Sequence, residues 1–179
     1  SPRLSRLQAT IEDAIAGGAA TAQDPCLDIA PALKDTPPGL AIFDETLENV
    51  PEEAKIEKAK QLEEAARSVD PARIKKVRKA SYQEVRSRKT LVNSNGLRFS
   101  YAATFVSVSV TVVAESSEES EVGWDFDYSH FLHDLDVESV GRSAGKKALE
   151  KLGGRRVPSG VYPVLLNNRV ASEFLSPLA

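Results

Sequence analysis

The 179-residue sequence contains no methionine, one tryptophan and one cysteine. Because Cys26 has no second cysteine to pair with, neither an internal disulfide nor a multi-cysteine metal site can form, and we interpret Cys26 as a free structural thiol. No apolar run approaches the ~20 residues that a membrane-spanning helix needs, and no signal-peptide pattern opens the chain. These absences predict a cytoplasmic protein without membrane contact.

A surplus of either charge is also missing. The 23 Lys and Arg residues against 26 Asp and Glu residues give a net charge of −3. Proteins that bind nucleic acids or anionic membranes through general electrostatics need a basic surplus, so this composition argues against both kinds of partner. The length and the 41% hydrophobic content are typical of about one globular domain.

Three stretches have the periodicity of amphipathic helices, namely residues 4–18, 51–70 and 136–152. Proline is favoured at a helix start, so Pro51 is predicted to open the second, and Asp136 is predicted to cap the third. The predicted apolar stripes are Leu4, Leu7, Ile11, Ala14 and Ile15; Ile56, Ala59, Leu62, Ala66 and Val69; and Val137, Val140, Ala144, Ala148 and Leu152.

Period-two alternation predicts strands in the middle of the chain. Residues 75–92 alternate charged and apolar side chains, Asn93–Gly96 supplies an Asn-Gly hairpin turn, and the return strand occupies residues 97–114. Apolar residues change parity within that strand, so we expect an irregularity or a change of packing partner near Thr104–Val106. A further strand at residues 121–127 would complete an antiparallel meander.

The predicted fold class is therefore α+β, with an antiparallel hairpin-rich sheet flanked by helices. Residues 158–167 resemble a buried strand that leads into a helix from Val170. Since a chain does not normally end where a core strand has just entered a helix, we expect the sequence to be a fragment of a longer protein.

Two motifs invite catalytic interpretations. Gly141–Gly145 matches the G-x-S-x-G pattern of a nucleophile elbow, which requires a strand ending in a strained turn. The match lies inside the helix predicted from Asp136, so we favour small residues that let this helix pack closely on the sheet.

His130 and His133, with four aspartates nearby, could hold zinc, but they lack the H-E-x-x-H spacing and a glutamate base. We favour a polar surface turn.

Eight basic residues lie between Arg73 and Lys89, and an acidic segment follows at Glu115–Asp127. A nucleic-acid surface would interleave aromatic residues with the cations, and only Tyr82 does so. We favour a solvated sheet face on which the acidic segment lies close to the basic strand, with DNA binding as the less favoured alternative. A sheet edge could also bind an extended peptide by strand addition.

The order of these features resembles the TldD/PmbA (TldE) family, also known as peptidase U62 or modulator of DNA gyrase. The resemblance is carried by the turn at Val92–Leu97 with its following strand, by Asp136–Gly141 with its helix, and by Gly160–Leu166 before a helix. It implies that residues 1–153 are the family's middle α+β domain and that residues 157–179 begin a C-terminal, protease-like domain.

TldD-type members of the family are zinc metalloproteases with an H-E-x-x-x-H helix after that last strand. Aligning Pro163–Leu166 with the strand places Ser176 and Pro177 where the first His and the Glu would stand. Serine is a poor substitute for an imidazole ligand, and proline cannot act as a general base. The resemblance is thus to the PmbA/TldE type. It implies no catalytic, cofactor-binding or metal-ligating residue in this chain, with zinc only in a catalytic partner.

By this resemblance the chain is expected to be a non-catalytic subunit of a TldD/TldE-type zinc metalloprotease complex that processes unfolded or modified peptides. The expected partners are a zinc-bearing TldD-like subunit or a homo-oligomer, together with unfolded peptide substrates. The alternatives are a modulator that binds gyrase or DNA directly, and an active metalloprotease whose zinc site lies beyond Ala179.

Overall fold

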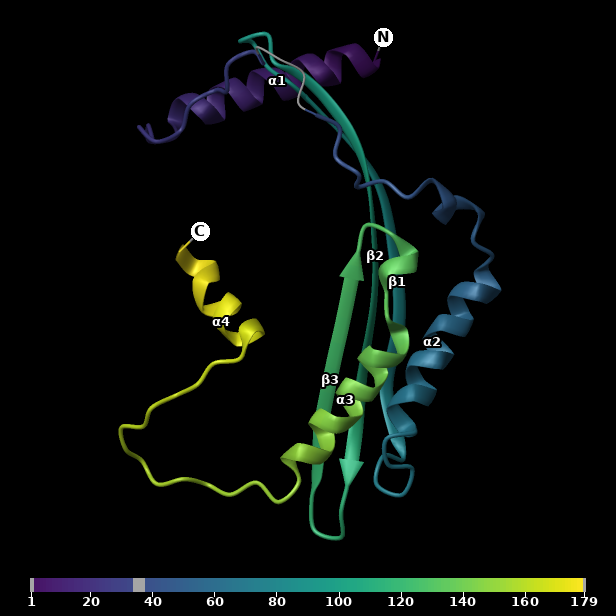
Figure 1. Ribbon diagram of the computed structural model, residues 1–179. Helices are drawn as coiled ribbons and strands as arrows, with labels where there is room; N and C mark the ends of the chain where they lie inside the picture. The colour runs from purple at the N-terminus through teal and green to yellow at the C-terminus, as the bar shows by residue number, and fades with distance from the viewer. Residues whose placement is uncertain (1, 34–37, 179) are drawn as a thin grey trace. The chain divides into compact units, whose positions relative to one another are not determined.

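The computed structural model of the protein describes residues 2–33 and 38–178. Strands β1 (Lys76–Val92), β2 (Arg98–Glu115) and β3 (Ser120–Ser129) form one sheet in the order β1-β2-β3 (Figure 1). The predicted antiparallel meander and the α+β class are confirmed. The chain divides into two compact units: unit 1 is Ser1–Val50, Gln83–Ser107 and Tyr128–Leu135, and unit 2 is Pro51–Tyr82, Val108–Asp127 and Asp136–Ala179.

Helices account for most of the remaining regular structure. The α-helices are α1 (Pro2–Ala20), α2 (Glu52–Arg67), α3 (Val137–Lys151) and α4 (Asn168–Leu175), and the short 3-10 helices are η1 (Glu45–Asn49), η2 (Leu132–Asp134) and η3 (Ser176–Leu178). As predicted, Pro51 precedes α2, and Asp136 caps α3 by accepting a hydrogen bond from the Ser139 N–H at 2.9 Å. Among the described residues, no helix combines the length and the apolarity needed to cross a membrane.

Helix α1 forms as predicted but runs past its two glycines to Ala20. Its apolar stripe is exposed, with Leu4 and Ile15 each 67% accessible, so within the described residues the helix is not buried on a core. Gly17 and Gly18 do not end the helix, since neither adopts the positive φ of a glycine at a helix C-terminus.

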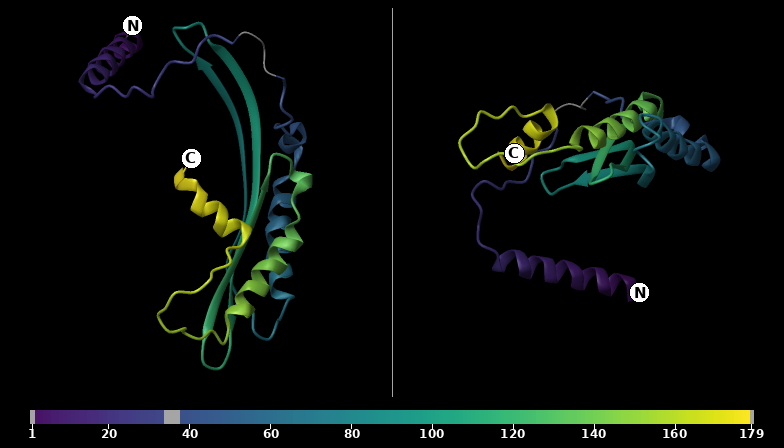
Figure 2. Two further views of the ribbon diagram at one scale, coloured as in Figure 1. Left: turned by 60° about the vertical axis from the view of Figure 1, so that its left-hand side comes forward. Right: turned by 90° about the horizontal axis from the view of Figure 1, so that it is seen from below.

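In unit 2, α3 lies between α2 and β3 at backbone contact distance (Figure 2). A Cβ added to Gly141 would come within 2.6 Å of the Leu62 carbonyl oxygen, and one added to Gly145 within 2.7 Å of the Ala66 carbonyl oxygen. On the sheet side the close approach depends on Gly123 of β3, because a Cβ at this position would overlap the α3 backbone. The glycines of the G-x-S-x-G motif therefore fit α3 against α2, whereas the predicted close packing of small residues on the sheet occurs at Ala144, whose backbone lies against Gly123 of β3.

The core of unit 2 follows from alternation along β2. Val108, Val110, Val112 and Ala114 point to one face and are at most 1% exposed, as expected for a strand with one buried face. Small and branched residues of the two helices cover that face, namely Leu62, Ala65, Ala66, Val137, Val140, Ala144 and Ala148. Ile56, at the start of the stripe predicted for α2, stays about half exposed.

In unit 1, β2 changes its packing partner at Thr104, as its change of parity predicted. The strand is continuous there, but the Thr104 N–H donates to the Ile42 carbonyl oxygen at 2.9 Å. The buried Thr104 hydroxyl accepts from the Asp44 N–H at 2.9 Å and donates to the His130 carbonyl oxygen at 2.6 Å. Asp44 in turn accepts the Leu132 N–H at 3.1 Å. One hydroxyl thus joins three separate parts of the chain.

The hairpin between β1 and β2 turns at the predicted Asn-Gly pair. Gly96 adopts a φ of +83°, a left-handed conformation that a side chain would disfavour. The side-chain amides of Asn93 and Asn95 donate to the carbonyl oxygens of Ala30 (2.7 Å) and Ile29 (3.0 Å). The turn therefore also holds the irregular segment that follows α1.

The buried strand predicted at residues 158–167 is wrong. The segment is irregular, and Val161 and Leu165 are fully exposed. A buried strand needs a neighbouring strand for its backbone and a covering layer for its side chains, and the described residues supply neither at this position. The helix predicted to follow does form, as α4, capped by the Asn167 side chain.

Replacing Gly123 with alanine tests the close approach of β3 to α3. We expect the Gly123→Ala variant to lose about 1–3 kcal/mol of unfolding free energy, because the added methyl group would overlap the α3 backbone and displace the helix from the sheet. Gly17→Ala is the matched control, since its new Cβ meets nothing within 4 Å. Urea denaturation of both variants measures the difference, and equal stabilities would contradict the packing described here.

Removing the Thr104 hydroxyl tests its bridging role in unit 1. Thr104→Val leaves a buried N–H and a carbonyl oxygen without a partner, so we expect a loss of about 1–3 kcal/mol. Thr111→Val is the control, because this half-buried threonine of the same strand has no side-chain hydrogen bond in the described structure. Thermal unfolding compares the two, and an equal effect would show that the bridge adds nothing.

Candidate functional site

Asp125 on β3 is a buried charge at which three elements of unit 2 meet. Only 7% of its side chain is exposed. Its Oδ2 accepts from the Lys147 ammonium of α3 at 2.9 Å, and its Oδ1 accepts from the Arg169 guanidinium at the start of α4. The Phe126 N–H donates to Oδ1 at 2.8 Å. The carboxylate therefore links β3, α3 and α4.

Strand alternation explains why Asp125 lies at this point. Gly123 and Asp125 are the buried positions on β3 and face α3, whereas Trp124 and Phe126 lie on the opposite side, where their rings stack with centroids 5.5 Å apart. On α3, residues four apart share one face, so Ser143 and Lys147 both reach the carboxylate.

The pKa of Asp125 reflects opposing effects. Burial raises it, but hydrogen bonds from Ser143, Lys147, the Phe126 N–H and Arg169 outweigh the burial and hold the pKa below its usual value of 3.8. Asp125 is consequently ionised at neutral pH and cannot serve as a general acid there. Its oxygens are already occupied, so the geometry favours a structural charge centre over a catalytic carboxylate.

Cationic side chains also cover the outer edge of β3. The Arg169 guanidinium donates to the Phe126 carbonyl oxygen at 2.9 Å and lies 4.6 Å from the centroid of the Phe126 ring. Four residues away along the strand, the Lys151 ammonium donates to the Val122 carbonyl oxygen at 2.7 Å. Cations on an edge strand disfavour pairing with another chain, so this edge is protected against strand addition at those carbonyls.

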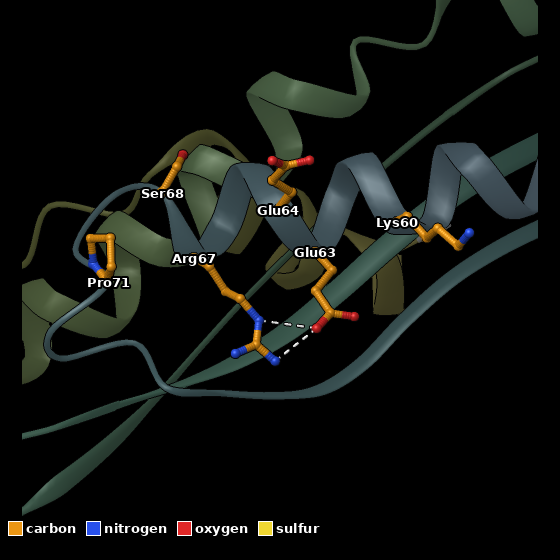
Figure 3. A pocket seen from close by; sticks show the side chains of 6 residues that line it. All are labelled: Lys60, Glu63, Glu64, Arg67, Ser68 and Pro71. Carbon is orange, nitrogen blue, oxygen red and sulfur yellow. Dashed lines mark hydrogen bonds and ion pairs between the residues drawn. The ribbon is translucent and has the colours of Figure 1, made fainter.

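A small cavity of about 190 Å³ adjoins this centre. Its lining is mostly polar and includes Asp125, Asp127, Asp136, Ser139, Ser143 and Arg169. A wider groove of about 560 Å³ follows the outer side of α2 (Figure 3). Figure 3 shows Arg67 turned toward Glu63, which it binds through two hydrogen bonds of 3.0 and 2.7 Å.

Ser143 of the G-x-S-x-G motif has no elbow geometry. Helix α3 begins at Val137, so the serine lies in its second turn and no strand leads into it. Its hydroxyl lies beside the Asp125 carboxylate, whose pKa it lowers, and both residues line the same small cavity. The motif matches because glycines are needed on both sides of the serine for contact with α2.

The two histidines are placed in unit 1 and bind backbone and carboxylate groups. His130 Nδ1 lies 2.6 Å from the Thr104 carbonyl oxygen, and His133 Nε2 lies 3.3 Å from an oxygen of Asp134. In the described part of the chain, no group of three or more His, Cys, Asp or Glu side chains is arranged to hold a metal ion. The expectation that this chain ligates no metal stays a prediction.

The basic strand is paired only in part as predicted. Lys76 lies 2.9 Å from Glu115, and Arg86 lies 3.5 Å from Glu48 outside the acidic segment. Most of the acidic segment belongs to the β2–β3 turn and to β3, and β2 separates β3 from β1. The predicted proximity of the two segments therefore holds at Glu115 but not along β3.

Comparison with known proteins identifies the chain's relatives. The PmbA/TldA metallopeptidase central domain matches residues 45–152, which contain α2, the whole sheet and α3. The chain belongs to the TldD/PmbA family. Metalloprotease PmbA of Escherichia coli O157:H7 is 30% identical to it over 172 residues, covering 94% of this chain. The chain spans 38% of the length of that relative.

Solved structures of the TldD/PmbA family share the fold. A Bacteroides thetaiotaomicron protein described as a modulator of DNA gyrase superposes with a TM-score of 0.80 at 26% identity, covering 97% of this chain and 40% of its own. TldE from Thermococcus kodakarensis has a TM-score of 0.62 at 19% identity, covering 81% of this chain and 32% of its own, and shows similarity of fold alone. The division into domains at residues 153 and 157 stays a prediction.

Neutralising Asp125 tests the charge centre through its pH dependence. Because the folded-state pKa lies below 3.8, the carboxylate stabilises the fold above that pH and loses this effect as the pH falls through the folded-state pKa. We expect Asp125→Asn to lower the unfolding free energy by about 1–3 kcal/mol at pH 7. The gap to the unsubstituted protein should narrow toward pH 2 in urea titrations.

Asp13→Asn serves as the control for that titration, since Asp13 of α1 is exposed and has no hydrogen bond or ion pair in the described structure. A gap for Asp125→Asn that stays constant between pH 7 and pH 2 would show that the ionised form of Asp125 does not stabilise the fold.

Proposed function

We propose that this protein is a PmbA/TldE-type, non-catalytic subunit of a TldD/TldE-type zinc metallopeptidase assembly that handles unfolded or modified peptides. Family membership supports the metallopeptidase setting. The proposal assigns the hydrolytic zinc site to a TldD-like partner and leaves substrate handling and assembly to this chain.

The observation that carries the proposal is the pair Ser176 and Pro177. By resemblance these residues stand where TldD-type proteins have the first histidine and the glutamate of their zinc motif. They follow α4 directly and open η3. A hydroxyl is a weak zinc ligand, and the proline side chain has no group that accepts a proton. Ser176 and Pro177 therefore offer neither the zinc ligand nor the general base that zinc hydrolysis needs.

A second candidate function is direct modulation of DNA gyrase. It is favoured by the description of the Bacteroides thetaiotaomicron relative as a modulator of that enzyme. The net charge of −3 opposes contact with DNA itself, and in the described part of the chain several cations of the basic stretch already bind carboxylates. We therefore rank this function second.

Reconstitution tests the proposed function. The protein expressed from its complete gene should contain no stoichiometric zinc and should not cleave unfolded peptides alone. It should support cleavage when a zinc-bearing TldD-like partner is added, because that partner supplies the metal-activated water. Zinc analysis and a peptide-cleavage assay measure both expectations.

The decisive control uses a partner whose H-E-x-x-x-H glutamate is replaced by glutamine. Cleavage that persists with this inactive partner, or cleavage by the protein alone, would place the chemistry in this chain and refute the proposal. Salt-sensitive binding to gyrase or DNA without any effect on peptide cleavage would favour the second candidate.

A further inference from the structure

The attachment of α4 to the rest of unit 2 depends on polar contacts more than on apolar burial. Phe174 and Leu175, the large apolar side chains near the end of α4, are 67% and 63% exposed. Val170 and Ala171 are only half-buried. An eight-residue helix with this little burial is marginal by itself, so another interaction must hold it in place.

The connection that leads to α4 does not supply that interaction. Residues 153–167 are exposed throughout, and within this connection the Tyr162 hydroxyl donates to the Pro158 carbonyl oxygen at 2.9 Å, a local contact. Val161 and Leu165 have no covering side chains. The connection therefore behaves as a tether of irregular backbone between α3 and α4.

Arg169, in the first turn of α4, makes three contacts with β3. Its guanidinium binds the buried Asp125 carboxylate, donates to the Phe126 carbonyl oxygen and lies over the Phe126 ring. The planar guanidinium suits this combination, because its separate N–H groups reach two acceptors while its face stacks on the ring. An ammonium group also has several N–H donors, but it lacks the planar fork and the flat face that stacks on the ring.

We infer that Arg169 is a positioning residue: it anchors α4, and with it the Ser176–Pro177 segment, to the outer edge of β3. The anchoring stands on the contacts of unit 2 alone. Its use rests on the proposed function, since in an assembly with a zinc-bearing partner it would fix the segment that replaces the zinc helix. Release of Arg169 would free the tether and α4 together while the packing of α2, α3 and the sheet persists.

Hydrogen–deuterium exchange on this 179-residue chain tests the anchor without zinc, partner or substrate. In Arg169→Gln, we expect backbone amides of residues 168–176 to exchange about tenfold faster or more, corresponding to loss of charge-assisted hydrogen bonds. Amides of α3 and β2 should keep their protection. Arg169→Lys should fall between the two, because lysine restores the charge but not the two-acceptor geometry.

Arg156→Gln is the matched control, since this exposed arginine of the tether has no hydrogen bond or ion pair in the described structure. Near-ultraviolet circular dichroism of the single tryptophan, Trp124, checks that the sheet stays folded. Unchanged exchange in α4 of Arg169→Gln would overturn the inference. Equal acceleration in α3 and β2 would also overturn it, by showing that Arg169 supports the whole unit.

The outcomes separate this inference from the proposed function. Loss of α4 protection in Arg169→Gln, together with peptide cleavage by the protein alone, would leave the anchor in place and refute the non-catalytic assignment. Normal α4 protection in Arg169→Gln, together with partner-dependent cleavage, would refute the anchor and support the non-catalytic assignment.

Discussion

The packing of unit 2 depends on three places where a side chain is missing. Gly141 and Gly145 let the α3 backbone touch α2, and Gly123 lets β3 touch α3 from the other side. Because backbones cannot be compressed, a methyl group at any of these positions would push the layers apart. The small core residues Ala144 and Ala148 fit the same narrow spacing.

The close approach has an electrostatic consequence. It brings Lys147 and Ser143 of α3 within reach of Asp125, where both help to keep the buried carboxylate ionised. Arg169 then completes the same charge centre from α4. One carboxylate on β3 thus serves the packing of α3 and the docking of a later segment. In unit 1 the Thr104 hydroxyl has a comparable role among backbone groups.

Much of the fold could be predicted, whereas little of the candidate site could. Pro51, Asp136 and the Asn-Gly turn mark their elements through local backbone chemistry, and β3 follows from alternation over a short range. The charge centre joins residues 22 and 44 positions apart, and no local pattern links Asp125 to Lys147 or Arg169. The G-x-S-x-G match lies in α3, which does contribute to the charge centre, but its glycines serve the packing against α2 and have no catalytic role there.

By itself, the sequence determined the helices, the hairpin and the antiparallel order, because capping, turn geometry and side-chain periodicity act over a few residues. The order of these features also resembled that of the TldD/PmbA family, to which the comparisons assign the chain. Only the tertiary structure determined the conformation of residues 158–167. Their apolar composition predicted a buried strand, but the segment is irregular and exposed. A strand is a property of two segments rather than one, so its partner must be present before its own residues can specify it.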